Sequence, residues 1–171
     1  MAQLDLALEK VLKNEGGYKL HNVKGDTGGQ TYAGIARNFH PTWPGWSFID
    51  RADFNLSKLK PLVKDFYLYE FWQRIKGDDI ADQEVAESIF DFAVNASIRV
   101  ASKLVQIVVG AKPDGIIGSM TIAKINGVNK NLFLATFALA KVQRYADLCN
   151  NNRKYSKFLL GWINRVLRGL S

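Results

Sequence analysis

The sequence predicts a mainly α-helical protein with a small glycine-rich β-hairpin lobe after its first helix. Apolar residues recur at helical spacing over most of the 171 residues, as far as the segment 155–168. Residues 18–36 are instead rich in glycine, threonine and tyrosine, a composition typical of turns and short strands. A chain of this length buries a sizeable core, and its hydrophobic content of 47% is ordinary for a globular domain.

The first predicted helix spans residues 3–15. Its apolar residues Leu4, Leu8 and Val11 are spaced to share one face. The pair Gly16-Gly17 ends the helix, because glycine adopts the left-handed conformation of a helix terminus without steric cost. Glu15 is therefore expected on the last turn, where the helix dipole disfavours an anion by roughly 0.3–1 kcal/mol. A residue that breaks a local rule in this way is a candidate functional residue, here a general acid.

The glycine-rich segment 18–36 predicts a short hairpin or an irregular lobe beside the end of this helix. A loop follows at residues 40–46, marked by two prolines and a glycine. Trp43 and Trp46 in this loop have two interpretations: they pack over the core, or they form an apolar platform for a sugar ring.

Helical periodicity resumes at Ser57 and continues, with interruptions, to the C-terminus. The predicted helices lie within residues 57–72, 83–96, 99–109, 131–149 and 155–168, with a short helix after the turn 113–118. We expect two lobes, residues 1–80 and residues 81–171. We also expect them to pack as one core, since the helix at 83–96 is too apolar to remain half-covered.

Composition limits the kinds of site and partner. The chain has one cysteine, Cys149, and two histidines, His21 and His40, so no internal disulfide forms and no metal-ligand cluster is recognisable. We therefore expect neither a metal nor another cofactor. The formal net charge of +7 favours an anionic partner such as nucleic acid, a membrane surface or the bacterial cell wall. No apolar run has the length of a membrane span, and the N-terminus lacks the pattern of a signal peptide.

The chemistry of the opening segment points to Glu15, Asp26 and Thr31. A helix end followed by a tight glycine-rich excursion places these three on one side of a cleft, and glycosidases need an acid together with a second group that holds water or attacks the sugar. Gly28 and Gly29 allow the backbone to approach a polysaccharide closely. Alternatively, Glu15 is a surface acid and Asp26 an Asx-turn residue. The candidate substrate-binding residues are Tyr18, Gly28, Gly29, Tyr32, Asp91 and Asn95.

Asp91 and Asn95 lie four residues apart in the predicted helix 83–96, so they share one face. Their apolar neighbours predict that both are at least partly buried and need hydrogen-bond partners. They either tie this helix to a neighbouring segment or face the cleft near Glu15.

The motifs Asn14-Glu15-Gly16-Gly17-Tyr18 and Asp26-Thr27-Gly28-Gly29-Gln30-Thr31 resemble the signature of glycoside hydrolase family 108, the N-acetylmuramidases of phage endolysins and related bacterial proteins. Later segments occur in the expected order, so the resemblance covers nearly the whole chain. They are Phe71-Trp72, residues 90–95, residues 114–118 with Thr121, and residues 161–165. One departure is the stretch 19–24, which lacks the Asp-Pro that commonly follows the first tyrosine.

The resemblance implies a lysozyme-like fold and cleavage of the β-1,4 bond after N-acetylmuramic acid in peptidoglycan, with Glu15 as catalytic acid. The order of Glu15, Asp26 and Thr31 also resembles the catalytic triad of phage-type lysozymes. The C-terminal half resembles a peptidoglycan-binding segment. We expect inversion of configuration, through a water held by Asp26 and Thr31, because these two residues and Glu15 lie on different elements.

Two other functions compete with hydrolysis: a non-catalytic wall-binding or secretion-associated protein of the same fold, and a basic nucleic-acid binder. The second is disfavoured because lysine and arginine are spread along the chain. We expect a monomer that is not inserted in a membrane and does not bind nucleic acid. It would be made in the cytoplasm and act at the cell wall or in the periplasm after release by an unidentified route.

Overall fold

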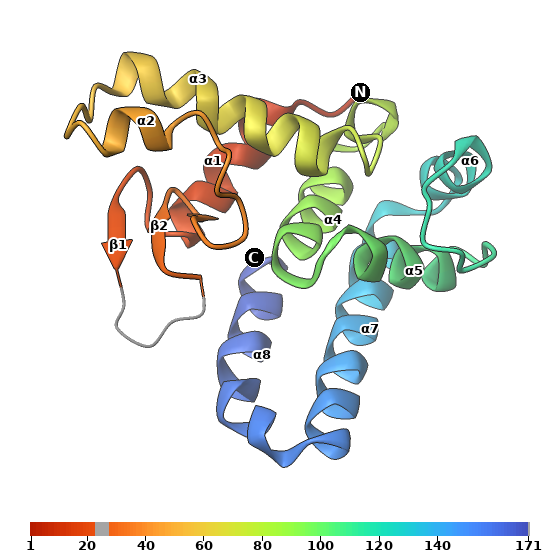
Figure 1. Ribbon diagram of the computed structural model, residues 1–171. Coiled ribbons are helices and arrows are strands. Elements are labelled where there is room, and N and C mark those ends of the chain that lie inside the picture. Colours follow the sequence, from red (N-terminus) through yellow and green to blue (C-terminus); the bar gives the residue numbers. More distant parts are fainter. Residues whose placement is uncertain (23–27, 171) are drawn as a thin grey trace. The chain divides into compact units, whose positions relative to one another are not determined.

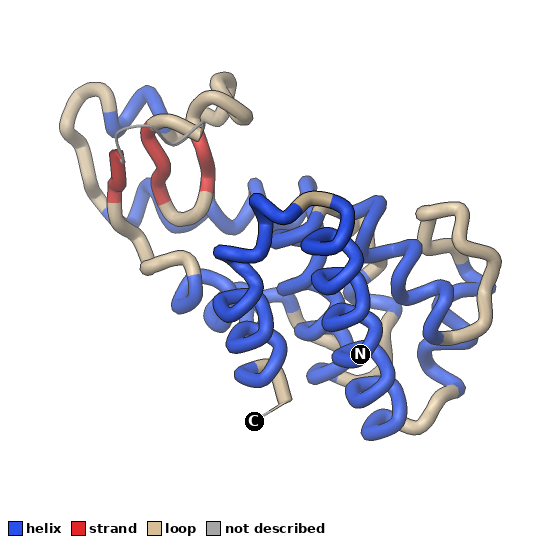
Figure 2. The backbone as a smooth tube through the Cα atoms, turned by 90° about the horizontal axis from the view of Figure 1, so that it is seen from below, coloured by secondary structure: helices blue, strands red, loops and turns tan. Residues whose placement is uncertain are grey.

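The computed structural model describes residues 1–22 and 28–170, and it confirms the mainly α-helical fold class (Figure 1). The chain forms two compact units. The N-terminal unit spans residues 3–73, and the C-terminal unit comprises the first two residues and the chain from Arg74 onward. The described strands all lie in the glycine-rich segment, as predicted (Figure 2).

The N-terminal unit begins with helix α1, which buries one apolar face. Leu8, Val11 and Leu12 are each at most 6% exposed, and full burial of such a side chain contributes about 1.5–3 kcal/mol. The elements of this unit are α1 (Leu4–Asn14), β1 (Leu20–Asn22), β2 (Gln30–Tyr32), β3 (Ile35–Ala36), α2 (Trp46–Ile49), α3 (Leu56–Tyr67) and a π-helical turn, η1 (Leu68–Trp72).

The three strands form an antiparallel sheet in the order β1-β2-β3. A two-residue turn joins β2 to β3, and both of its residues have positive φ, 49° at Ala33 and 79° at Gly34. This is the pattern of a type I′ hairpin turn, whose twist matches that of the flanking strands. Ala33 adopts the left-handed conformation although it has a Cβ atom, and it is completely buried.

Helix α3 begins at a side-chain cap: Asn55 accepts a hydrogen bond from the backbone N–H of Ser57 at 2.9 Å. Its residues Leu59, Val63 and Tyr67, spaced by four, are 0–1% exposed. The buried face of α3 therefore ends in a tyrosine.

All regular secondary structure in the described part of the C-terminal unit is helical. Helix α4 packs against α5 and α7, and α7 and α8 form an antiparallel pair joined by a 3₁₀ segment. The bounds are η2 (Gly77–Asp79), α4 (Gln83–Ala96), α5 (Ile98–Val108), α6 (Ser119–Gly127), α7 (Lys130–Asn151), η3 (Arg153–Phe158) and α8 (Leu159–Arg168). Phe92 and Phe137 meet edge to face in the core, with ring centroids 5.6 Å apart.

The turn after α5 is held by one buried side chain. The Gln106 amide accepts from the N–H of Gly115 at 2.8 Å and donates to Asp114 at 2.8 Å and to the Ile116 carbonyl at 3.0 Å. Gly115 has φ +86°. The Asp-Gly-Ile motif is therefore a turn that the hydrogen bonds of the buried Gln106 side chain stabilise.

The boundary between the units falls after Gln73, a few residues before the predicted boundary at residues 80 and 81. The shared core of the two lobes stays a prediction. Within the residues that the structure describes, no helix is both long and apolar enough to cross a membrane.

Candidate active site

Glu15 caps the C-terminal end of α1, one residue beyond the helix. Its N–H donates to the carbonyl of Val11 at 2.9 Å, and the N–H of Gly17 donates to the carbonyl of Leu12 at 2.8 Å. The latter bond spans the helix end as in a Schellman motif, and it requires the left-handed conformation that Gly16 adopts at φ +86°. The glycine pair thus ends the helix as predicted and leaves the Glu15 side chain half-buried.

The Glu15 side chain lies against the turn between β2 and β3. A Cβ atom placed on Gly34 would be 3.2 Å from Glu15 Cγ and would also contact the hydroxyl oxygen of Tyr67. That hydroxyl donates to the carbonyl of Ala33 at 2.9 Å, in a fully buried hydrogen bond. Tyr67 therefore fixes the turn from α3, and the turn supports Glu15.

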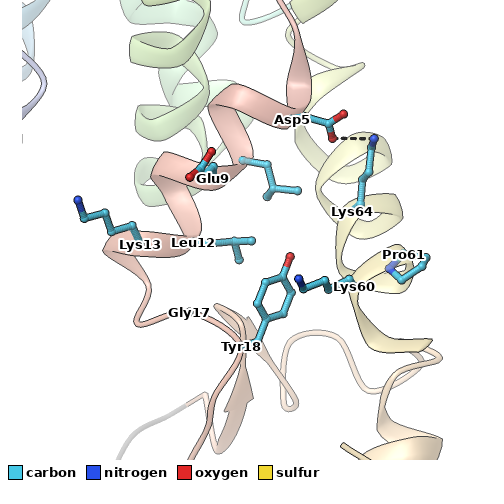
Figure 3. Close-up of a pocket in the computed structure, with 10 residues that line it drawn as sticks. Asp5, Glu9, Leu12, Lys13, Gly17, Tyr18, Lys60, Pro61 and Lys64 are labelled. Carbon is cyan, nitrogen blue, oxygen red and sulfur yellow. Dashed lines mark ion pairs between the residues drawn. The ribbon is translucent and has the colours of Figure 1, made fainter. Parts of the chain in front are cut away.

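Tyr18 follows Glu15 by three residues and borders a pocket of about 640 Å³ between α1 and α3 (Figure 3). Its ring is half-buried beside Leu12, and Lys60 Nζ lies 5.5 Å from the ring centroid. Burial raises the pKa of the Tyr18 hydroxyl above its usual value. Glu15 itself is not among the residues that line the pocket.

Thr31 lies in the middle of β2, opposite His21 of β1 and Ala36 of β3. Its hydroxyl donates to the carbonyl of Gly29 at 3.4 Å. Side chains of directly opposed residues lie on the same face of an antiparallel sheet. The side chains of His21 and Thr31 therefore lie on the same face. The His21 ring also approaches the helix end, with Nε2 3.3 Å from a Cβ position on Gly16.

Gly28 and Gly29 pack against Asn38. The Gly28 carbonyl accepts from the Asn38 N–H at 3.1 Å. Gly29 has φ +68°, and a Cβ there would lie 3.0 Å from the Asn38 amide nitrogen. These contacts explain the glycines structurally, and their predicted contact with substrate stays a prediction. Asp26 lies outside the described residues, so the distance between its carboxyl group and that of Glu15 is also outside the described structure.

Tyr32, which the sequence predicts to bind substrate, lies in the core of the N-terminal unit. Its side chain is 1% exposed and stacks on Trp43, with centroids 6.0 Å apart. Trp43 and Trp46 are themselves buried and meet edge to face at 5.2 Å. These rings form core, which argues against direct contact of Tyr32 with a polysaccharide and against a surface platform at 43–46.

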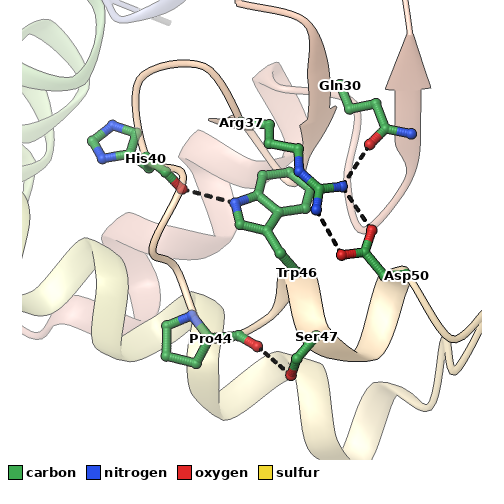
Figure 4. Close-up of polar contacts among 7 residues, drawn as sticks. All are labelled: Gln30, Arg37, His40, Pro44, Trp46, Ser47 and Asp50. Carbon is green, nitrogen blue, oxygen red and sulfur yellow. Dashed lines mark hydrogen bonds and ion pairs between the residues drawn. The ribbon is translucent and has the colours of Figure 1, made fainter.

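Arg37, immediately after β3, ties the sheet to α2 (Figure 4). Its guanidinium donates to Gln30 at 2.8 Å, pairs with both carboxylate oxygens of Asp50 at 2.7 and 2.6 Å, and lies 5.0 Å over the Trp46 ring. Hydrogen bonding by Arg37 lowers the pKa of the Asp50 carboxyl. Neither Arg37 nor Tyr67 was singled out from the sequence, because both act through partners distant along the chain.

Asp91 and Asn95 belong to the C-terminal unit, where both have partners on other helices. Arg165 of α8 binds the Asp91 carboxylate through two nitrogens, at 3.1 and 2.9 Å. The Asn95 amide donates to the Tyr145 hydroxyl of α7 at 3.4 Å. Asn95 is exposed, contrary to the predicted burial, and it is not among the residues that α4 buries. These bonds favour the interpretation in which the pair ties helices together.

Among the described residues, no group of three or more histidine, cysteine, aspartate or glutamate side chains is arranged to hold a metal ion. Glu15, Tyr18, Gly28, Gly29, Thr31 and Tyr32 all lie in the N-terminal unit. That unit therefore holds every described candidate except Asp91 and Asn95.

Comparison with protein families matches two of them in consecutive parts of the chain. Residues 8–96 match the family described as glycosyl hydrolase 108, and residues 100–167 match that described as predicted peptidoglycan domain. The solved structure of SagA from Brucella abortus is similar, with a TM-score of 0.74 and 30% identity over 97% of this chain and 90% of that one. No curated protein matches the chain. The first match includes α4, so it extends beyond the N-terminal unit.

Proposed function

The chain belongs to the glycosyl hydrolase 108 family, and from this membership we propose that it cleaves the β-1,4 bond after N-acetylmuramic acid in peptidoglycan, with Glu15 as the general acid. The predicted family resemblance is confirmed. Together the two family matches support a lysozyme-like function in peptidoglycan degradation. The bond and the catalytic residue are our proposal.

The observation that carries the proposal is the support beneath Glu15. A backbone motif fixes the end of α1, and the turn at Ala33 and Gly34 packs against the Glu15 side chain. Catalytic groups need such fixed geometry, because small displacements cost large factors in rate. A surface acid without a function has no need of a strained, buried turn beneath it.

In the proposed reaction, the Glu15 carboxyl donates its proton to the glycosidic oxygen as the bond to the anomeric carbon breaks. Asp26, assisted by the Thr31 hydroxyl, holds the water that attacks that carbon and accepts its proton. Asp26 then releases this proton to solvent and Glu15 takes one up, so both carboxyl groups return to their starting states. Neither a metal nor a cofactor takes part in these steps.

We also propose that the C-terminal unit contacts the wall through η3 and α8. Arg153, Lys154 and Lys157 are exposed here, and no acidic residue follows Asp147. The rings of Tyr155 and Phe158, 41% and 47% exposed, lie beside these cations. A basic surface with accessible rings suits an anionic glycan. Action at the cell wall or in the periplasm follows from this proposal.

The experiment that tests the proposed function is digestion of purified peptidoglycan with mass analysis of the products. Wild-type protein should release fragments with new reducing ends on muramic acid. Glu15→Gln should lower the rate by about 10²–10⁴-fold with an unchanged circular dichroism spectrum. Reducing ends on N-acetylglucosamine or anhydro products would contradict the proposed bond or the hydrolysis. A Glu15→Gln variant above about a tenth of the wild-type rate would exclude Glu15 as the acid. Binding without any turnover would favour the non-catalytic alternative.

A further inference from the structure

The pocket between α1 and α3 has an apolar floor and a charged rim (Figure 3). Leu8 and Leu12 of α1 form the floor and are 5% and 6% exposed. The Tyr18 ring closes one side. An apolar floor of this kind accommodates aliphatic groups, which gain free energy when they leave water.

The rim carries charges of both signs. Asp5 and Lys64 neutralise each other in an ion pair at 2.6 Å. Glu9 and Lys13 on α1 and Lys60 on α3 also line the pocket, and within the described part of the chain none of these three is in an ion pair. The pocket therefore offers two cations and one anion to a ligand with carboxylates and an amine.

The pocket is connected to the proposed catalytic residue through the backbone. Gly17, which lines it, is two residues beyond Glu15. Since consecutive Cα atoms are about 3.8 Å apart, the Cα atoms of Glu15 and Gly17 are at most about 7.6 Å apart. The lining of the pocket thus begins within two residues of the proposed acid, while Glu15 itself is not among the lining residues.

We propose that this pocket binds the peptide attached to muramic acid in peptidoglycan. This inference rests on the proposed function, because cleavage after muramic acid places that sugar next to Glu15, and its lactyl ether carries the peptide. The peptide has carboxylates for Lys13 and Lys60, an amine for Glu9 and aliphatic side chains for the floor. A pocket lined by cations alone would instead favour a simple anion.

The consequence is a preference for glycan that carries peptides. We compare kcat/KM on solubilised peptidoglycan with kcat/KM on the same glycan after an amidase has removed its peptides. Lys60→Ala should lower the first value about fivefold, the size expected of a partly exposed charge contact, and leave the second unchanged. Lys60→Arg should retain most of the preference. Lys112→Ala removes the same charge from an exposed position in the C-terminal unit and should change neither value. Equal loss on both substrates, or no loss on either, would overturn the proposal.

A second measurement separates this inference from the proposed function. Free stem peptide is titrated into ¹⁵N-labelled wild-type protein, without turnover, and should shift the backbone signals of Tyr18, Lys60 and Lys13. Lys60→Ala should weaken the binding, and Lys112→Ala should not. If the peptide shifts these signals but the protein does not cleave peptidoglycan, the peptide site is upheld and the proposed hydrolysis is refuted. If the protein cleaves peptidoglycan but the peptide causes no shifts, only the peptide site is refuted.

Discussion

Glu15 Cγ lies 3.2 Å from the position that a Cβ atom would take on Gly34, at the turn between β2 and β3. The contact joins a helix end to a hairpin turn nineteen positions further along the chain. On its other side the same Cβ position contacts the Tyr67 hydroxyl. Gly34 therefore has no room for a side chain between the proposed acid and the tyrosine that holds the turn.

Gly34→Ala should lower the rate on peptidoglycan by about tenfold or more. The new methyl group displaces the Glu15 side chain or the Tyr67 hydroxyl, and alanine is strained at φ +79°. Steady-state rates, with thermal unfolding in parallel, measure the effect. Gly127→Ala is the matched control, since its position at the end of α6 has open space around it and lies outside the proposed wall contact. Wild-type activity of Gly34→Ala would mean that Glu15 needs no support from this turn.

Tyr67→Phe should reduce the free energy of unfolding by about 1 kcal/mol. The substitution leaves the buried carbonyl of Ala33 without its 2.9 Å hydrogen bond while keeping the ring. Urea denaturation of both proteins gives the difference. The control substitution, Tyr69→Phe, removes a hydroxyl from an exposed ring and should change the free energy of unfolding little. Equal stability of Tyr67→Phe and wild type would show that the hydrogen bond contributes nothing.

The parts of the fold that could be predicted are those with local causes. Gly16 and Gly17 end α1 because a glycine pair satisfies the helix terminus without help from elsewhere, and the described strands lie within the glycine-rich segment 18–36. Glu15 could be singled out for the same reason, since its position relative to the glycines is encoded in adjacent residues.

The rest depends on contacts between distant residues. The Tyr67 bond to Ala33 spans 34 positions, and no spacing rule connects an aromatic residue in a helix to a hairpin turn. Tyr32 was expected at the substrate, but stacking on Trp43 buries it. The apolar neighbours of Asn95 predict that it is at least partly buried, yet its side chain is exposed. The local sequence pattern predicts the helix or strand, whereas contacts between distant residues determine which of its side chains are exposed.

The free energy of unfolding should increase as the pH rises from about 8 towards 10.5, because of the buried Lys141. Burial lowers the pKa of this lysine to about 8, while the unfolded chain keeps the ordinary 10.5. Between these values the unfolded state binds more protons, so raising the pH favours the folded state. Asp91 and Arg165 are the charged groups that also influence it. Urea denaturation at pH 7 to 10 should show the rise in wild type and a flatter profile in Lys141→Met. Identical profiles would refute the assignment.

Double substitution of Tyr155 and Phe158 by alanine should weaken binding to intact walls about tenfold, equivalent to about 1.4 kcal/mol. The two exposed rings border Lys154 and Lys157 in the proposed wall contact. Pull-down with purified walls measures the affinity, and rising salt should weaken the wild type through screening. Phe39→Ala, which removes an exposed ring from the N-terminal unit, is the control. Unchanged binding of the double variant would place the wall contact elsewhere.

Hydrolysis should proceed with inversion, giving the α-anomer from the β-linked glycan. Inverting glycosidases separate their carboxyl groups by about 6.5–9.5 Å to admit a water, whereas retaining ones keep them about 5–5.5 Å apart. Thr31 is the reason to expect the water. In the proposed mechanism its hydroxyl helps Asp26 to hold this water, a role that would be lost if the carboxylate attacked the sugar itself. Proton NMR of the first-formed product, recorded before mutarotation, distinguishes the two anomers. Asp26→Asn should reduce the rate strongly and Thr31→Ala by less. Thr136→Ala, whose hydroxyl bonds within α7, should leave the rate unchanged. A β-anomer, or a glycosyl-enzyme trapped on Asp26, would establish retention instead.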